Sequence, residues 1–366
     1  MEIGFIGIGK LGVCLASLIN TAGYNVYTYD KNSINSKNLS QKKIKSEEPD
    51  LESLVKQTNG ITHCDTVKQL TAKSKIIFVC VNTPSLTNGE YDISAVEDVC
   101  QKIKTNQGVA ESIVIVCTTN PGDCDRLELK YGIEILYSPE FIAQGSIVKD
   151  LKSPDLFLGT SGKINSHILL NIYKKIILKP ELTKFFFLSN KSLEIIKIAI
   201  NCFLTTKISF ANMVGQVLHE SDRGHEISEA LAAIGSDHRI NDKYLNFGYG
   251  FGGPCFPRDN RAFASFMKKA GVDCELGSVV DKFNVSHNLF LAQLLKKQNC
   301  QRLPFLFDSL SYKKGVKMFV ESRPLDVAEI LCKNGFKIYV KDHTEIPMLN
   351  FEVLPYTNEE VFYVNI

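Results

Sequence analysis

Ile3-Gly4-Phe5-Ile6-Gly7-Ile8-Gly9-Lys10-Leu11-Gly12 is the stretch that decides the fold of this chain. Its apolar start predicts a short strand, and the apolar positions within 13–19 predict a helix directly after the glycines. A second predicted strand, 24–30, ends in an acid. This order is typical of a dinucleotide-binding unit, in which glycines allow a tight turn, close helix packing and the approach of a pyrophosphate.

The glycines Gly7, Gly9 and Gly12 are therefore candidate cofactor-binding residues. Asp30 follows the second strand, where an acid binds the ribose hydroxyls of the cofactor. Because its carboxylate would repel a ribose phosphate, the sequence favours NAD over NADP.

Composition limits the class of protein. The 366 residues are enough for two or three domains, and the apolar fraction of 44% and charged fraction of 22% are those of a soluble globular protein. The formal charge of +2 and the lack of Lys/Arg blocks argue against nucleic acid or an anionic membrane as a partner. Apolar runs such as 76–81 are too short to span a membrane.

The eleven cysteines are odd in number and contain no C-x-x-C pair. Neither a zinc ribbon nor a disulfide framework is indicated, so we expect no metal site and a reducing, cytoplasmic location. The glycine motif begins at Gly7, which leaves no room for a signal peptide.

Three further predicted strands, 76–81, 112–117 and 133–137, end in hydroxyl residues, prolines and a carboxylate. Ligands of open parallel sheets bind at the carboxyl ends of strands. A single threonine there could equally be a turn cap, but the repetition favours a site. The polar segment 31–74 predicts short helices and loops without identifiable chemistry.

A long helix is predicted from Ser189 or Ser192 to about residue 221, after a last strand at 185–188. Glu194, Lys197 and Asn201 share one stripe of this helix. The stripe is either a solvated face or a site, and its apolar surroundings favour burial. The helix is long enough to join two domains and to supply a dimer surface.

Cys255 lies in the glycine-rich stretch 247–259 and is followed by Arg258 and Asp259. The glycines strip the backbone of side-chain bulk, as in a loop against which a large ligand lies. A packed thiol in a tight turn is the alternative, but the glycines and charges favour a nucleophile.

The fold class predicted is α/β, with a Rossmann-like NAD-binding domain at 1–188, a central helical domain at 189–300 and a short C-terminal α/β domain at 301–366. The middle of the chain predicts helices at 226–234, 260–270 and 279–298. The last domain predicts strands at 304–307 and 336–342 around a helix at 324–334.

Together these motifs resemble the nucleotide-sugar 6-dehydrogenase family, typified by UDP-glucose and GDP-mannose dehydrogenases, over nearly the whole chain. The matching residues are Gly7 to Gly12, Thr83-Pro84, Thr118 with Pro121-Gly122, Pro139-Glu140-Phe141, Glu194-x-x-Lys197-x-x-x-Asn201, Arg239-Ile240, Gly252 to Asp259 and Ser311-Tyr312-Lys313.

The resemblance implies a four-electron oxidation of the sugar C6 alcohol to a carboxylate with NAD, through a thiohemiacetal and a thioester on Cys255. The implied catalytic residues are Cys255, Lys197, Asn201, Asp259, Glu140 and Thr118. Lys197 and Asn201 would stabilise the developing oxyanion, and Thr118, Glu140 and Asp259 would position water and handle protons.

The resemblance also implies binding residues and a homodimer, since Arg239 matches an arginine that reaches a neighbouring subunit's nucleotide. Cofactor contacts are expected at Gly7, Gly9, Gly12, Asp30, Thr83, Pro84, Thr118, Gln144 and Arg258. Contacts to the nucleotide sugar are expected at Glu140, Phe141, Lys197, Asn201, Arg239, Tyr244, Leu245, Tyr249, Gly252 and Lys313.

The chain departs from the family pattern at Gln144, Leu156, Arg258 and the order Glu321-Ser322-Arg323. These departures leave the nucleotide and the sugar open: UDP-glucose is the first expectation, and a UDP-N-acetylhexosamine or GDP-mannose the alternative. Two other classes are a one-hydride dehydrogenase of the hydroxyacid or phosphogluconate kind and a catalytically silent NAD-binding scaffold. The number of NADH formed per substrate distinguishes them.

Overall fold

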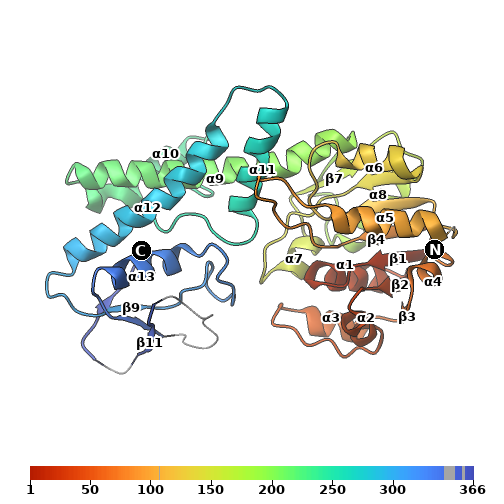
Figure 1. Cartoon of the computed structure of the whole chain (residues 1–366), viewed down its shortest axis with the longest axis horizontal. Coiled ribbons are helices and arrows are strands. Elements are labelled where there is room, and N and C mark those ends of the chain that lie inside the picture. Colours follow the sequence, from red (N-terminus) through yellow and green to blue (C-terminus); the bar gives the residue numbers. More distant parts are fainter. Residues whose placement is uncertain (107, 342–350, 357–358) are drawn as a thin grey trace. The chain divides into compact units, whose positions relative to one another are not determined.

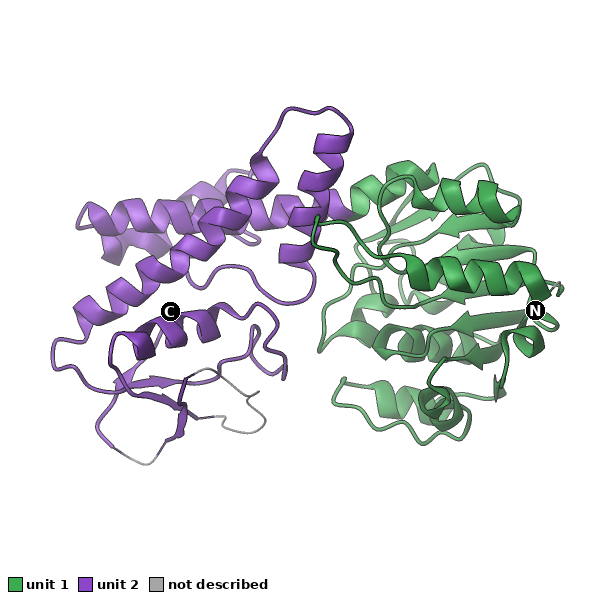
Figure 2. Ribbon diagram, viewed as in Figure 1, with its two compact units in different colours: residues 1–197 green, residues 198–366 purple. Residues whose placement is uncertain are grey.

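The computed structural model describes residues 1–106, 108–341, 351–356 and 359–366. The chain divides into two compact units, Met1–Lys197 and Ile198–Ile366, shown in green and purple in Figure 2. The boundary falls inside the long helix α9 (Asn190–Glu220). Each unit has its own sheet and its own apolar core.

The first unit is built on a six-stranded parallel sheet with the order β3-β2-β1-β4-β5-β6 (Figure 1). The chain fills one half of the sheet from β1 outward and then returns to the other side of β1 with β4, which creates a switch point between β1 and β4. This is the doubly wound arrangement that the glycine motif predicts. The strands are β1 (Glu2–Ile6), β2 (Asn25–Tyr29), β3 (Ile61–His63), β4 (Ile76–Val79), β5 (Ser112–Ile115) and β6 (Glu134–Tyr137).

The central strands are buried on both faces, as parallel sheets require. Every residue of β4 and β5 is buried, and Phe5 of β1 stacks on Phe78 of β4 with ring centroids 4.9 Å apart. The continuous apolar runs of the sequence therefore mark these strands correctly.

Helices cover both faces of the sheet. Helix α1 contacts α3, α7 and α8, whereas α5 contacts α4 and α6. Gly12 lets α1 pack closely, because a Cβ at that position would lie 2.1 Å from the Gly7 carbonyl oxygen. The helices are α1 (Lys10–Thr21), α2 (Ser33–Ser40), α3 (Leu51–Gln57), α4 (Val67–Thr71), α5 (Ser94–Asn106), α6 (Asp123–Tyr131), α7 (Ile147–Lys152) and α8 (Ser166–Ile176).

A separate two-stranded parallel sheet follows, formed by β7 (Leu156–Thr160) and β8 (Lys184–Leu188). Strand β8 confirms the strand predicted at 185–188. Strands β3 and β7 were not predicted, because β3 has only three residues and β7 has no alternating pattern. The expectation of helices and loops alone for 31–74 was therefore wrong at β3.

The second unit combines helices with a four-stranded parallel sheet of order β11-β10-β9-β12. Leu291 and Leu295 of α12 belong to the same core as Phe305 and Phe307 of β9 and Leu331 of α13. The elements are η1 (Gly224–Glu226), α10 (Ile227–Ser236), α11 (Phe256–Lys269), α12 (Leu276–Gln298), α13 (Arg323–Lys333), β9 (Phe305–Phe307), β10 (Ile338–Val340), β11 (Leu354–Pro355) and β12 (Phe362–Tyr363).

The predicted second α/β unit is confirmed, and so is the α/β fold class. Strands β11 and β12 were not predicted, since each has only two residues. Asp342, the predicted end of a strand, lies outside the described residues. The proposed division at residue 300 stays a prediction. In the part of the chain described, no helix has the length and apolar character needed to cross a bilayer.

Candidate active site

A cavity of about 620 Å³ opens at the carboxyl ends of β1, β2 and β4 in the first unit. Gly7, Gly9 and Asp30, all predicted cofactor residues, line it together with Cys80 and Asn82. The structure thus brings the glycine loop and the acid of the second strand together at the switch point of the sheet, where open α/β sheets bind ligands.

The glycine loop fits the pyrophosphate of a dinucleotide. Gly7 has φ +94°, and a Cβ there would lie 2.6 Å from the Cys80 carbonyl oxygen. Gly9 precedes α1, and no heavy atom lies within 4 Å of the place where its Cβ would stand. The N-cap residue of α1 is Gly9, which has no side chain to accept from the first backbone amides, and this suits a helix N-terminus that receives an anion.

Asp30 lies beside this loop. Its Oδ2 accepts a hydrogen bond from the Ile8 backbone N–H at 2.6 Å, and its Oδ1 accepts one from Asn32 at 2.8 Å. These hydrogen bonds orient the carboxylate at the end of β2, from where it can accept hydrogen bonds from ribose hydroxyls.

Three other predicted cofactor residues take different places. Thr83, which is buried, and Pro84, which is exposed, are not among the described residues that line the cavity. Gln144 accepts a hydrogen bond from Lys10 Nζ at 3.2 Å, which puts its amide next to the start of α1.

Lys197 lies against the segment that follows β6. Its Nζ donates to the backbone carbonyl of Glu140 at 2.7 Å and stands 4.4 Å from the centre of the Phe141 ring. The structure therefore joins three residues that the sequence placed in one site. The carbonyl dipole and the ring face together hold the ammonium group in one position.

The side chain of Glu140 points to a residue that the sequence did not single out. Tyr173 of α8 donates its hydroxyl proton to Glu140 Oε1. Burial raises the pKa of Glu140 to about 7, although the Tyr173 hydrogen bond and the Lys197 charge oppose the shift. A carboxyl that titrates near neutral pH can both take up and release a proton during turnover.

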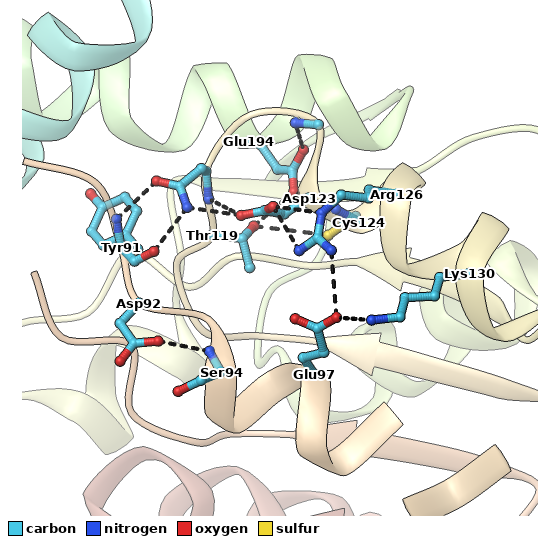
Figure 3. A network of polar contacts seen from close by, with 12 residues as sticks. Tyr91, Asp92, Ser94, Glu97, Thr119, Asp123, Cys124, Arg126, Lys130 and Glu194 are labelled. Atoms are coloured by element: carbon cyan, nitrogen blue, oxygen red, sulfur yellow. Dashed lines mark hydrogen bonds and ion pairs between the residues drawn. The ribbon is translucent and has the colours of Figure 1, made fainter. Parts of the chain in front are cut away.

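Thr118 follows β5 and is 8% exposed, and the next residue, Thr119, is fully buried. Thr119 Oγ1 donates to Glu194 Oε1 at 2.8 Å (Figure 3). Glu194 also accepts from the Gly122 backbone at 2.6 Å and from the Cys124 backbone at 3.0 Å. Since Glu194 is 0% exposed, its side of the helix stripe is not the solvated face considered above.

The same loop is tied to the segment after β4. The Asn120 side chain accepts from the Tyr91 backbone at 2.9 Å and donates to its carbonyl at 3.0 Å. It also donates to Asp123 at 2.8 Å, and Asp123 in turn contacts Arg126, as Figure 3 shows. The segments that follow β4 and β5, two neighbouring parallel strands, are therefore joined at one edge of the sheet.

Cys255 carries an exposed thiol in the second unit. It is the N-cap residue of α11, which begins at Phe256 and has a proline in its first turn. The predicted start near residue 260 was wrong, because Pro257 initiates a helix at this position rather than extending the loop. The Cys255 carbonyl accepts from the Asp259 backbone at 2.8 Å, which closes the first helical turn.

Asp259 lies on that first turn and is fully buried. Its Oδ2 accepts from Asn201 Nδ2 at 2.6 Å, and its Oδ1 lies 3.3 Å from Arg258 Nε. Three predicted site residues, from α9 and α11, are therefore in contact beside the thiol-bearing turn.

The glycine loop before Cys255 is held from several sides. Asn284 of α12 accepts from the Phe251 backbone N–H at 2.8 Å and donates to its carbonyl at 2.8 Å. The buried Arg323 donates to the same carbonyl at 3.1 Å. A Cβ on Gly252 would lie 2.3 Å from the Glu321 carbonyl oxygen, so the loop needs glycine there for close approach.

The remaining predicted substrate residues are less closely gathered. Arg239 is exposed and forms an ion pair with Asp237 at 2.6 Å. Tyr244 has φ +64° and its ring centroid lies 6.4 Å from that of Phe256, whereas Leu245 is buried. Tyr249 is partly buried. Lys313 is exposed, and its backbone forms an isolated antiparallel β-bridge with that of Val316.

Sequence reasoning missed Tyr173 and Arg323 as partners of the candidate residues. Tyr173 is part of an apolar helix face, so its hydroxyl gave no signal of its own. Arg323 could have been suspected, since it stands where the chain departs from the family order.

Two family models match this chain. The NAD binding domain of the UDP-glucose/GDP-mannose dehydrogenase family matches residues 1–177, and the central domain of the same family matches residues 191–286. Together they cover the glycine loop, Lys197 and Cys255.

Similar proteins agree with these models. A UDP-glucose 6-dehydrogenase of Rickettsia felis is 30% identical over 96% of this chain and 80% of its own length. A GDP-mannose 6-dehydrogenase of Pseudomonas aeruginosa is 26% identical over 93% of this chain and 81% of its own length.

A solved UDP-glucose dehydrogenase from Pyrobaculum islandicum superposes with a TM-score of 0.82 at 26% identity, covering 93% of this chain and 81% of that one. With the cavity at the switch point of the sheet, these matches show an NAD-dependent oxidoreductase, and the chain belongs to the UDP-glucose/GDP-mannose dehydrogenase family.

Proposed function

We propose that this enzyme oxidises the C6 alcohol of UDP-glucose to the carboxylate of UDP-glucuronate and forms two NADH for each sugar. The observation that carries the proposal is the exposed Cys255 thiol at the N-terminus of α11, one helical turn from the buried Asp259 and its partner Asn201. A one-hydride dehydrogenase has no use for such a thiol.

In the first oxidation, the C6 hydroxyl gives its proton to a base while the C6 carbon gives up a hydride, which leaves an aldehyde. NAD, when bound, accepts one hydride in each of the two oxidations. Lys197 and Asn201 are four residues apart on α9, so both can stabilise the negative charge that develops on the C6 oxygen. The Glu140 carbonyl and the Phe141 ring hold the Lys197 ammonium in place for this task.

In the second half, the Cys255 sulfur adds to the aldehyde carbon, and the carbonyl oxygen takes up a proton. The resulting thiohemiacetal loses a hydride and its hydroxyl proton and becomes a thioester. A helix N-terminus stabilises an adjacent anion, which supports the thiolate as the attacking species.

Water then cleaves the carbon–sulfur bond, releasing the carboxylate and returning a proton to the sulfur. We assign Thr118, Glu140 and Asp259 to the positioning of this water and the handling of its protons. Glu140 is the best supported of the three, because its pKa of about 7 lets it exchange protons near neutral pH.

UDP-glucose is preferred as substrate because the relative with 30% identity and the solved structure with 26% identity both carry that name. GDP-mannose is the first alternative, since the Pseudomonas relative is 26% identical, and a UDP-N-acetylhexosamine is the second. Our candidates for binding the nucleotide sugar remain Phe141, Arg239, Tyr244, Leu245, Tyr249, Gly252 and Lys313. Thr83, Pro84, Gln144 and Arg258 remain candidates for binding the cofactor.

The test supplies each nucleotide sugar singly, in limiting amount, with excess NAD, and measures NADH by absorbance. Two NADH per UDP-glucose, with UDP-glucuronate as the product by mass spectrometry, is the expected result. One NADH per sugar would overturn the four-electron mechanism. No turnover with any of the sugars would favour the silent scaffold.

Cys255→Ala is expected to abolish acid formation and to leave NADH affinity unchanged. Cys274→Ala is the matched control, because Cys274 is also an exposed thiol of the second unit. Full acid formation by Cys255→Ala would remove the thioester from the mechanism. A reducing, cytoplasmic location is part of the proposal, because the cysteines are odd in number and contain no C-x-x-C pair.

A homodimer through α9 is part of the proposal. Four large apolar side chains of α9 are exposed: Phe203 (67%), Phe210 (46%), Met213 (42%) and Val217 (65%). Their spacing aligns them along one side of the helix. Such a stripe is typical of a helix that packs on another helix. Phe210→Glu should shift the protein from dimer to monomer in light scattering. Leu129→Glu, at an exposed position of α6, should leave the dimer intact.

A further inference from the structure

Among the residues that the structure describes, Glu194 is the most completely buried carboxylate that the proposed mechanism does not use. It is 0% exposed, and its two oxygens accept hydrogen bonds from Thr119 Oγ1, the Gly122 backbone and the Cys124 backbone. Burial raises the pKa of its carboxyl, and these donors act in the opposite direction. All three donors come from the segment 119–124, which comprises the turn after β5 and the first residues of α6, and Figure 3 shows Thr119 and Cys124 of this segment beside Glu194.

That turn carries Thr118. Thr118 is directly bonded to Thr119, whose side chain is anchored on Glu194 at 2.8 Å. Gly122 has φ +99° and precedes α6, so its N–H is aimed by a backbone conformation that few residues adopt. The position of Thr118 at the end of β5 therefore depends on how firmly Glu194 holds the turn.

Glu194 also stands three residues before Lys197 on α9. Residues at this spacing lie on the same side of a helix, one turn apart. Since Lys197 Nζ is held by the Glu140 carbonyl at 2.7 Å, the helix is pinned at both residues to segments at the carboxyl ends of neighbouring strands, β5 and β6.

We infer that Glu194 is a positioning residue, which sets the place of Lys197 relative to Thr118 without touching the substrate. The inference rests on the roles proposed above for those two residues. A helix that slides or rotates slightly against the turn would move the oxyanion-stabilising ammonium away from the water-positioning hydroxyl. Displacements of about 1 Å from a productive geometry can cost about a hundredfold in rate.

A carboxylate suits this place better than its amide. The hydrogen atoms that the Thr119 hydroxyl and the Gly122 and Cys124 backbones point at Glu194 need acceptors, and an ionised carboxylate has only acceptors. In Glu194→Gln one oxygen becomes an NH₂ group, which must face a donor that Glu194 now satisfies. As a result, the turn shifts or loses a hydrogen bond. Because the side chain keeps its shape, the volume of the core is unchanged.

The matched control is Glu134→Gln. Glu134 accepts hydrogen bonds from Ser112 at 2.7 Å, the Ile164 backbone at 2.6 Å and Asn165 Nδ2 at 2.9 Å in the same unit. It is thus a second multiply bonded carboxylate, but it lies at the start of β6, away from the turn that holds Thr118. A role in stability alone predicts similar behaviour for both variants.

The experiment first establishes the NADH stoichiometry of the unmodified enzyme, so that failure of the proposed function is recognised separately. Glu194→Gln is then expected to lower kcat about tenfold to a hundredfold and to leave the Kd for NADH within about twofold. Glu134→Gln is expected to keep kcat within about twofold, whatever its effect on the unfolding midpoint. Unchanged kcat in folded Glu194→Gln, or an equal loss in Glu134→Gln, would overturn the inference.

A milder variant covers the case in which Glu194→Gln does not fold. Thr119→Val keeps the side-chain volume and removes a single donor to Glu194. It should lower kcat by a smaller factor, about threefold to tenfold, with the Kd for NADH unchanged. In a Lys197→Met background, Thr119→Val should cause a much smaller loss, because the ammonium that Glu194 places relative to Thr118 is then absent. Fully additive losses would contradict this role of Glu194.

Discussion

Asn201 and Asp259 are hydrogen-bonded at 2.6 Å, although 58 positions separate them in the sequence. The amide belongs to α9 and the fully buried carboxylate to the first turn of α11, one turn after Cys255. The orientation of the thiol-bearing helix therefore depends on a polar contact with α9, the helix that carries the residues proposed to stabilise the oxyanion.

Asn201→Asp should destabilise the protein, because two carboxylates would then face each other in a buried contact. We expect a loss of about 3 kcal/mol in the free energy of unfolding, measured by denaturant titration. The double variant Asn201→Asp with Asp259→Asn restores one donor and one acceptor and should recover most of that loss. Equal destabilisation in the single and double variants would show that the hydrogen bond is unimportant.

The raised pKa of Glu140 predicts a pH dependence. If its ionised form takes the proton of the attacking water, kcat should rise with pH through an apparent pKa of about 7. Tyr173→Phe removes a hydrogen bond that favours the ionised form of Glu140, so the rise of kcat should move to higher pH. Tyr131→Phe, at another buried tyrosine, should leave the profile unchanged.

The same shift has a consequence for stability. Because the folded-state pKa of Glu140 is raised, its protonation stabilises the folded state fully below the ordinary carboxyl pKa, and this contribution is lost as the pH rises through about 7. Glu140→Gln should flatten that part of the stability curve, as measured by unfolding at pH 5 and pH 8. A curve that keeps its slope would assign the titration to another group.

Asp30→Ala should weaken NADH binding about tenfold to a hundredfold, since a charged hydrogen-bond acceptor for the ribose is lost. The variant should also show a smaller difference in affinity between NADH and NADPH, because the repulsion between Asp30 and a ribose phosphate disappears. Fluorescence titration with both cofactors measures the two effects. Asp98→Ala is the control: Asp98 lines the same cavity but is paired with Lys102 at 2.6 Å.

Gly252→Ala should displace the Cys255 loop, because its Cβ would lie 2.3 Å from the Glu321 carbonyl oxygen, and backbone cannot yield as a flexible side chain does. We expect a fall in kcat of about tenfold or more. Peptide mass spectrometry should show a changed alkylation rate at Cys255 but not at Cys274. Gly248→Ala, whose Cβ would meet its nearest neighbour at 3.9 Å, should behave like the unmodified enzyme.

Much of the fold could be read from the chain, because local sequence signals specify it. The glycines around Gly7, the apolar strands and the acid at Asp30 predict the dinucleotide-binding sheet, and the structure confirms it. Very short strands such as β3, β11 and β12 escaped prediction, because two or three residues carry no periodicity and pair only when a neighbouring strand is in place.

The sequence by itself determined the cofactor class and the identity of the candidate residues, since motif spacing records which groups the chemistry needs. Tertiary structure alone decided which of these groups meet. It buried Glu194 under the turn after β5, joined Glu140 to Tyr173 and closed Asn201 on Asp259. Such contacts depend on packing between distant segments, and the protonation of Glu140 follows from the desolvation that this packing creates.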